Sequence, residues 1–391
     1  MSLELDKSAW KRVKLGEVAA ASKEKVDPSN GSVDRFIAGE HMDTDDLKIH
    51  RWGDPSEVDL GPAFHRRFRP GQVLYGSRRT YLRKVAVADF HGVCANTTFV
   101  VETNDPRVLL QEFLPFVMTS EPFHAFAIAE SKGSVNPYVN WSDIARYEFV
   151  LPPLDEQKRI ADLLWAVERE RRGLVSLLNQ LDGARSLMRD QLFTELSAAT
   201  MPFESVCSIP SQNGVALKKS ERAGNVPMVN MGEMFRDEII ASGGDYERVR
   251  PPGDGFLLNE GDLLFARRSI VFEGAGACCL VPELDQPYTF ESSVIRSRVR
   301  SDLLDPRFAL HFFRSARGRD VMASIVRRGP VSGIAGSDLR KLPVPIPDMT
   351  TQKRVITMVE QAGSAAPAVQ LRRSAASKLG AALSADAFGG S

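Results

Sequence analysis

Two segments of the chain concentrate positive side chains of the kind that bind phosphate groups. Residues 60–88 contain no Asp or Glu, and residues 307–337 contain a single acidic residue, Asp320. Arginine and lysine neutralise phosphates and displace their counterions, so the two patches favour nucleic-acid binding although the formal net charge of the chain is +0. For any single residue a solvated surface is the simpler interpretation. The basic residues are Arg66, Arg67, Arg69, Arg78, Arg79, Arg83 and Lys84, then Arg307, Arg314, Arg317, Arg319, Arg327 and Arg328.

Within these patches and near residue 265, arginine pairs follow apolar runs that end in an aromatic residue. At the exit of a strand, a guanidinium group could bond a guanine edge through two hydrogen bonds or hold a phosphate. A salt bridge inside the domain is an equally open alternative. The candidate DNA-contacting residues at these positions are Tyr75, Arg78, Arg79, Arg267 and Arg268.

Two loops add further hydrogen-bond donors at corresponding places. The stretches "SKGSVNPY" (131–138) and "RRGPVSGI" (327–334) combine flexible backbone with polar and basic side chains. Their glycines, Gly133 and Gly329, are equally well explained as turn residues. The candidate DNA-contacting residues of the loops are Lys132, Ser134, Asn136, Tyr138, Arg327, Arg328 and Ser332.

Two fragments suggest an alternative, a DNA methyltransferase or a fused restriction-modification enzyme. "FEGAG" (272–276) is similar to an FxGxG cofactor loop, and "NPY" (136–138) is similar to an N-P-P-Y catalytic loop. The second fragment lacks one of the two prolines of the N-P-P-Y motif. The two fragments also occur in the reverse of the order that is usual in enzymes of this kind. The glycine fragment leads into "ACCLVP", which predicts a strand, whereas a cofactor loop should open a helix. We therefore predict a plain loop there, no catalytic residue and no metal site in this chain.

Most of the chain is a duplication with a dominant shift of 195 residues, half of its 391. A repeat of this length predicts two domains of one plan and not a solenoid. The matching pairs, in chain order, are residues 71–79 with 261–269, 96–99 with 291–294, 105–113 with 305–313, 141–144 with 336–339, and 157–160 with 352–355.

Each half is predicted to be an α+β domain that ends in a proline junction followed by a helix. Short runs rich in β-branched and apolar residues predict strands, and proline-initiated segments predict helices. The expected strands are at 71–76, 97–103, 261–268 and 292–299, and the expected helices at 106–120 and 306–316. The predicted domains are 1–153 and 199–347, with helical segments at 154–198 and 348–391.

The two long helical segments carry apolar residues at intervals of seven, which predicts a coiled-coil seam. Gly363, Pro367 and Gly380 weaken the second helix, and Pro367 is expected to kink or break it. A coiled-coil scaffold with no DNA role is a further alternative, but it leaves the paired basic patches unexplained. The seam positions are Ile160, Val167, Leu174, Leu181, Met188, Val355, Ala362, Val369, Ala376 and Leu383.

This arrangement resembles the specificity subunit of type I restriction-modification systems. The resemblance rests on "LPPLDEQKRIADLL" (151–164), "LMRDQLFTEL" (187–196), "RFIAGEHMDTDDLKI" (35–49) and "SKGSVNPYVNWSDI" (131–144). It implies two target recognition domains that each read one half of a bipartite site in double-stranded DNA, with the helices packed as an antiparallel intramolecular coiled coil that serves as the spacer. It further implies docking of two methyltransferase subunits, which carry S-adenosylmethionine, and of restriction subunits where a system has them. The specificity subunit itself has no cofactor and no catalytic centre.

The second junction departs from the family pattern, because it lacks the paired prolines and the acidic residue before Gln352. This predicts a weaker second methyltransferase dock. Forty-odd helical residues span roughly 60 Å, which predicts half-sites separated by several unread base pairs. Four cysteines without metal-ligand spacing, a charged N-terminus and the lack of a long apolar run predict a cytoplasmic protein that binds no membrane.

Overall fold

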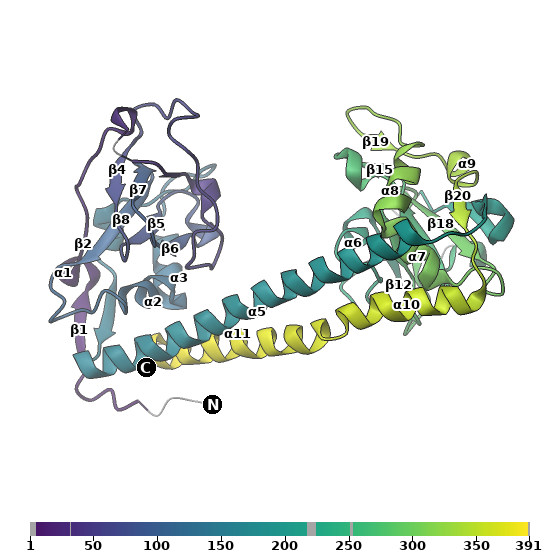
Figure 1. Ribbon diagram of the computed structural model, residues 1–391. Helices are drawn as coiled ribbons and strands as arrows, with labels where there is room; N and C mark the ends of the chain where they lie inside the picture. Colours follow the sequence, from purple (N-terminus) through teal and green to yellow (C-terminus); the bar gives the residue numbers. More distant parts are fainter. Residues whose placement is uncertain (1–4, 32, 217–223, 251–252, 390–391) are drawn as a thin grey trace. The chain divides into compact units, whose positions relative to one another are not determined.

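The computed structural model of the protein describes residues 5–31, 33–216, 224–250 and 253–389 (Figure 1). The chain divides into two compact units. Unit 1 comprises residues 1–176 and 370–391, and unit 2 comprises residues 177–369. Each unit therefore contains one half of the duplication together with parts of the long helices. None of the described helices is both long enough and apolar enough to cross a membrane.

Unit 1 is built on a four-stranded antiparallel sheet and a smaller three-stranded sheet. The order of the larger sheet is β2-β8-β5-β6, and that of the smaller is β3-β7-β4, with β3 parallel to β7. An antiparallel pair, β1 with β9, leads into the junction. The strands are β1 (Lys11–Lys14), β2 (Ala19–Ala21), β3 (Phe36–Ile37), β4 (Phe64–Phe68), β5 (Val73–Gly76), β6 (Val85–Val87), β7 (Gly92–Ala95), β8 (Thr98–Thr103) and β9 (Glu148–Leu151).

Unit 2 repeats this plan. Its larger sheet has the order β11-β18-β14-β16, and β10 pairs with β20 in front of the second junction. Its smaller sheet again contains a parallel pair, β12 with β17, but the order is β13-β12-β17, so the central strand differs from that of unit 1. The strands are β10 (Thr200–Pro202), β11 (Cys207–Asn213), β12 (Val226–Val229), β13 (Glu247–Val249), β14 (Asp262–Ala266), β15 (Arg268–Ser269), β16 (Cys278–Leu280), β17 (Thr289–Phe290), β18 (Val294–Val299), β19 (Ser332–Gly333) and β20 (Pro343–Pro345).

The four expected strands are confirmed as β5, β8, β14 and β18, but one expected helix is only partly correct. Residues 306–314 form α7, whereas residues 106–113 form turns and the helix in this region begins at Leu114. Pro115 has no N–H, so a helix through residues 106–113 could not continue across it. The helices are α1 (Leu15–Val18), α2 (Leu114–Thr119), α3 (Glu121–Ala129), α4 (Trp141–Ile144), α5 (Leu154–Glu195), α6 (Met231–Met234), α7 (Pro306–Arg314), α8 (Ala316–Ala323), α9 (Gly336–Leu339), α10 (Met349–Gly363) and α11 (Ala366–Phe388).

The long helices belong to the domain cores. In unit 1 the cluster around Tyr75 and Phe123 includes Ile160 of α5 and Phe388 of α11. In unit 2, Phe193 of α5 lies in the same cluster as several phenylalanines and with three apolar residues of α10. Burial of such side chains stabilises by roughly 1.5–3 kcal/mol each. The apolar stripes of the helices are therefore covered by the domains as well as by the opposite helix.

All ten predicted seam positions are buried or half-buried. In unit 1, a Cβ atom added at Gly380 would lie 3.2 Å from Val167, and Arg372 pairs with Glu170 at 2.6 Å. Residue numbers rise along α5 as they fall along α11, so the two segments run antiparallel, as expected. The expected break is also confirmed, because α10 ends at Gly363 and Pro367 lies in the first turn of α11, where its missing N–H is tolerated.

A buried glutamine joins each helix start to its domain. The Gln157 side-chain oxygen accepts from Leu110 N at 2.9 Å, and its nitrogen donates to the carbonyl oxygens of Val108 and Pro152, each at 2.9 Å. Gln157 is only 1% exposed. Its side chain therefore pairs three backbone groups; the bond to the Pro152 carbonyl oxygen is buried and the other two are partly buried.

Gln352 makes the same three bonds in unit 2. Its oxygen accepts from Asp305 N at 2.8 Å, and its nitrogen donates to the carbonyl oxygens of Leu303 and Pro347, each at 2.9 Å. Every partner is shifted by 195 residues from its counterpart, and both glutamines stand fourth in their helices. The repeated junction motif thus has a specific structural role, although the second copy lacks the paired prolines.

We expect Gln352→Ala and Gln157→Ala to lower the free energy of unfolding by about 3 kcal/mol or more, because each leaves buried backbone groups unpaired. Chemical denaturation followed by circular dichroism measures the change. Gln361→Ala is the control, since Gln361 is an exposed residue of α10. Equal effects of Gln352→Ala and Gln361→Ala would contradict the assigned role.

Two buried histidines predict a pH-dependent stability. Burial lowers the pKa of His124 and of His311 to about 4, and within the described part of the chain neither ring nitrogen of His311 has a hydrogen-bond partner. Between pH 6.5 and 4 the unfolded chain binds protons that the folded chain does not. The free energy of unfolding should therefore be highest above pH 6.5 and fall through this window, by roughly 3 kcal/mol per histidine. In urea titrations, His311→Leu should remove about half of this decline; an unchanged decline would contradict the assignment.

Candidate nucleic-acid interface

In unit 2 the predicted basic loops lie side by side. Strands β15 and β19 pair antiparallel, with Arg268 opposite Gly333 (Figure 1). Arg268 is exposed, and its side chain has no hydrogen bond or ion pair among the residues described. Arg328 packs its guanidinium over the Phe272 ring at 4.3 Å. Two exposed cationic side chains thus lie on one loop pair and remain available to a ligand.

The two other predicted arginines of unit 2 have intramolecular partners. Arg267 is half-buried and donates to the Ser292 carbonyl oxygen at 3.2 Å. Arg327 is exposed and pairs with Asp338 at 2.8 Å. Exposed ion pairs of this kind are weak, so Arg327 could exchange Asp338 for a phosphate, whereas Arg267 holds the loop in place.

The corresponding loops of unit 1 also come together. Arg78 forms a backbone bridge with Tyr138 and packs its guanidinium over the Tyr138 ring at 4.8 Å. Arg79, at φ +50°, donates from Nε to Asn136 Oδ1 at 2.9 Å. Lys132 pairs with Asp143 at 2.9 Å. Ser134 is exposed at the turn. The structure thus brings these candidate residues together in unit 1, and Lys132 among them is already paired.

The loop pairs of the two halves have the same construction. Lys132 bridges Tyr138 in unit 1, and Arg327 bridges Gly333 in unit 2, positions that are each 195 residues apart. In both units a segment with an exposed arginine pairs with the second residue of this bridge. Arg78 pairs with Tyr138, and Arg268 pairs with Gly333. The candidate interface of each unit, called its ribbon below, is therefore a bridged loop pair bearing an exposed arginine; it is the strand pair β15 with β19 in unit 2 and a set of single bridges in unit 1.

Two predicted contact residues are excluded by burial. Tyr75 is 1% exposed, stacks on Phe99 within the core, and its burial raises the pKa of its hydroxyl. Ser332 is 4% exposed. The prediction that these two side chains contact DNA is wrong, because both face the domain interior. In Tyr75 the strand alternation places the ring on the core side of β5.

Much of the two basic patches is likewise structural. Arg66 donates to the Thr98 carbonyl oxygen at 2.9 Å, and Arg69 pairs with Glu24 at 2.8 Å. Arg83 pairs with both Asp45 and Glu121. In unit 2, Arg317 and Arg319 donate to backbone carbonyl oxygens. These residues have partners within the chain, so they are neither purely solvated surface residues nor free to meet a ligand.

Sequence reasoning missed an ionic cluster in unit 2. The carboxylate of Glu238 accepts from Arg185 and Arg189 of α5 and from Arg314 of α7, at 2.5, 2.7 and 2.9 Å. These arginines outweigh the desolvation of Glu238 and lower its pKa to about 2. The cluster fixes the loop after α6 against α5. No spacing in the sequence indicated it, because its members are 49 to 76 residues apart from Glu238.

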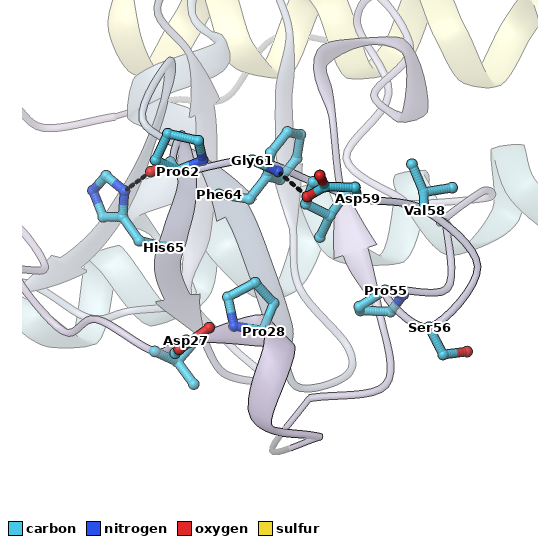
Figure 2. A pocket seen from close by; sticks show the side chains of 12 residues that line it. Asp27, Pro28, Pro55, Ser56, Val58, Asp59, Gly61, Pro62, Phe64 and His65 are labelled. Atoms are coloured by element: carbon cyan, nitrogen blue, oxygen red, sulfur yellow. Dashed lines mark hydrogen bonds between the residues drawn. The ribbon is translucent and has the colours of Figure 1, made fainter.

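A surface cleft of about 650 Å³ in unit 1 contains none of the predicted contact residues (Figure 2). It is lined by prolines, including Pro28 and Pro55, and by polar groups that serve local turns. His65 Nδ1 lies 3.1 Å from the Pro62 carbonyl oxygen, and Gly61 N donates to Asp59 at 3.1 Å. Within the described ranges no three His, Cys, Asp or Glu side chains gather where they could hold a metal ion.

The glycine fragment that suggested a cofactor loop is a turn between strands, as predicted. Residues Phe272–Gly274 form a single 3-10 turn between β15 and β16, and no helix follows. Cys278 and Cys279 of β16 enter two different apolar clusters, and all four cysteines are free. The backbone geometry that places a phosphate at a helix N-terminus is therefore not present at this fragment.

Comparison with known proteins supports a single family. Residues 7–179 match the family described as type I restriction modification DNA specificity domain. The chain is 22% identical over 274 residues to the MjaVIII specificity subunit of Methanocaldococcus jannaschii, covering 64% of this chain and 62% of that protein. It is 30% identical over 162 residues to the EcoKI specificity subunit of Escherichia coli K12, covering 41% and 34%. The matches thus span less than two thirds of either curated relative.

Solved structures share the fold over nearly the whole length. A chain of a type I R-M system has a TM-score of 0.57 at 19% identity and covers 98% of both chains. The S subunit of the type I restriction-modification system of M. genitalium has a TM-score of 0.59 at 12% identity and covers 100% of this chain and 99% of its own. Residues 7–179 thus match the specificity domain of type I restriction-modification systems, and the whole chain is similar in fold to solved chains of such systems.

Proposed function

We propose that this chain provides the DNA sequence specificity of a type I restriction-modification complex. Residues 1–153 and 199–347 act as target recognition domains, and each reads one half of a bipartite site in double-stranded DNA. The observation that carries the proposal is the repeated ribbon, which presents exposed Arg78 in one half and exposed Arg268 in the other. A two-stranded ribbon fits the major groove, and arginine is the commonest partner of a guanine edge there.

The site is asymmetric in this proposal, because the two ribbons share a backbone but differ in side chains. In unit 1, Arg79, Asn136 and Tyr138 surround the exposed Arg78. In unit 2, Arg328 and aliphatic residues stand beside Arg268. Different donors and apolar groups recognise different base edges. One fold can therefore read two unrelated half-sites.

The helical segments 154–198 and 348–391 are proposed to serve as the spacer and to dock two methyltransferase subunits, with restriction subunits joining where the system has them. The relatives named as specificity subunits support this assignment. S-adenosylmethionine then binds to the methyltransferase partners, and the chain itself is not an enzyme. We place the action of this chain in the cytoplasm, where it would meet the DNA that it binds. The half-buried and buried seam supports a fixed helix pair within each unit.

Selection from a random duplex library tests the proposal directly. The full chain, purified with its methyltransferase partners, is used to select DNA, and the selected duplexes are footprinted. We expect two short protected half-sites of different sequence separated by unselected base pairs. A single continuous or palindromic site would contradict the proposal, as would S-adenosylmethionine binding by the chain alone.

Substitution of one exposed arginine should affect recognition of one half-site and leave recognition of the other unchanged. We expect Arg268→Ala and Arg78→Ala each to weaken binding by roughly 1–3 kcal/mol if the arginine bonds a guanine edge, and to relax selectivity at one half-site only. Binding assays on duplexes with every single substitution measure this. Arg107→Ala is the matched control, because Arg107 is exposed, pairs with Asp105 and lies outside both ribbons. Loss of selectivity at both half-sites by one variant would contradict the assignment of one ribbon to each.

A further inference from the structure

Three aliphatic side chains protrude from the ribbon of unit 2. Ile270 is 87% exposed, Val271 60% and Val331 54%. Arg268 pairs with Gly333 and Ser269 with Ser332, so Ile270 directly follows and Val331 directly precedes the last paired residues of the two strands. A single exposed aliphatic residue needs no explanation. Three at the adjoining ends of β15 and β19 form a small apolar tip that is exposed to water.

The setting of this tip is cationic. Residues 267–272 and 326–333 contain four arginines and no Asp or Glu. Arg268 is exposed below the tip, and Arg328 lies over Phe272 at its side. An apolar tip framed by positive charge suits a polyanion that offers a small apolar group. In the DNA major groove the 5-methyl group of thymine is that group, and a two-stranded ribbon can enter this groove.

We propose that Ile270 and Val331, with Val271 beside them, contact the 5-methyl group of a thymine in the half-site read by residues 199–347. The inference rests on the proposed function and adds to it the identity of one recognised base. The arginines position the ribbon on phosphates or a guanine edge, and the aliphatic pair distinguishes thymine from cytosine and from uracil at one position. Contact with the methyl group removes apolar surface of both partners from water, which supplies the preference.

The first half does not carry the same arrangement. Its turn presents Val135, which is 84% exposed, and Tyr81, which is 52% exposed, lies in the separate segment after Arg79. The side chain of Arg79 donates a hydrogen bond to Asn136 of this turn. Polar groups therefore occupy the place where unit 2 has its aliphatic pair. The thymine contact is therefore assigned to the second half-site alone.

Replacement of thymine by deoxyuridine tests the proposal, because it removes the methyl group and leaves base pairing unchanged. The full chain with its methyltransferase partners is titrated with the selected duplex and with duplexes carrying one deoxyuridine at a time. We expect roughly threefold to tenfold weaker binding at one thymine of the second half-site. The double variant Ile270→Ala/Val331→Ala should bind thymine and deoxyuridine equally at that position. Val58→Ala, a change at a 53% exposed valine of unit 1, should keep the full difference.

The possible outcomes are distinguishable. A second half-site without thymine, or with no position sensitive to deoxyuridine, overturns this inference while sequence-specific binding leaves the proposed function standing. If no duplex is bound selectively, both fail. If Ile270→Ala/Val331→Ala keeps the deoxyuridine penalty but no longer co-purifies with the methyltransferase partners, the tip belongs to a protein interface and the inference is wrong.

Discussion

The arrangement of each half depends on one buried glutamine at the start of its helix. Gln157 and Gln352 each join three backbone groups from two places in the domain to the first turn of a long helix. An amide side chain is needed, because it accepts one hydrogen bond and donates two in a fixed plane. Removing it would leave buried polar groups unpaired, which is costly in a low-dielectric core. This constraint explains why the junction motif is repeated.

The orientation of the domain on its helix then determines where the ribbons point. In unit 2 the Glu238 cluster adds a second fixed attachment between α5, α7 and the loop after α6. In unit 1, Arg171 of α5 reaches Asp46 of the corresponding loop at 3.6 Å. Buried pairs of this kind are costly when one partner is removed. Most arginines of the basic patches bind partners within their own unit, and few remain at the ribbons to meet DNA.

The sequence allowed correct prediction of features with a period or a repeat. The 195-residue shift identified both halves, the heptad spacing identified the seam, and Pro367 identified the helix break. The sequence did not indicate that the arginine pairs and the two loops lie together; the structure shows that they do. Features that depend on tertiary partners could not be predicted. The burial of Tyr75, the turns at residues 106–113 and the partners of Arg66 or Arg83 are set by packing between segments distant in sequence.

The central claim is that each half of the duplication reads its own half of one DNA site. Methylome sequencing of a host that carries this chain with its methyltransferase partners tests it most directly. The account predicts one methylated bipartite sequence, with two unlike half-sites and a spacer of constant length. Methylation of a single uninterrupted or palindromic sequence would contradict it.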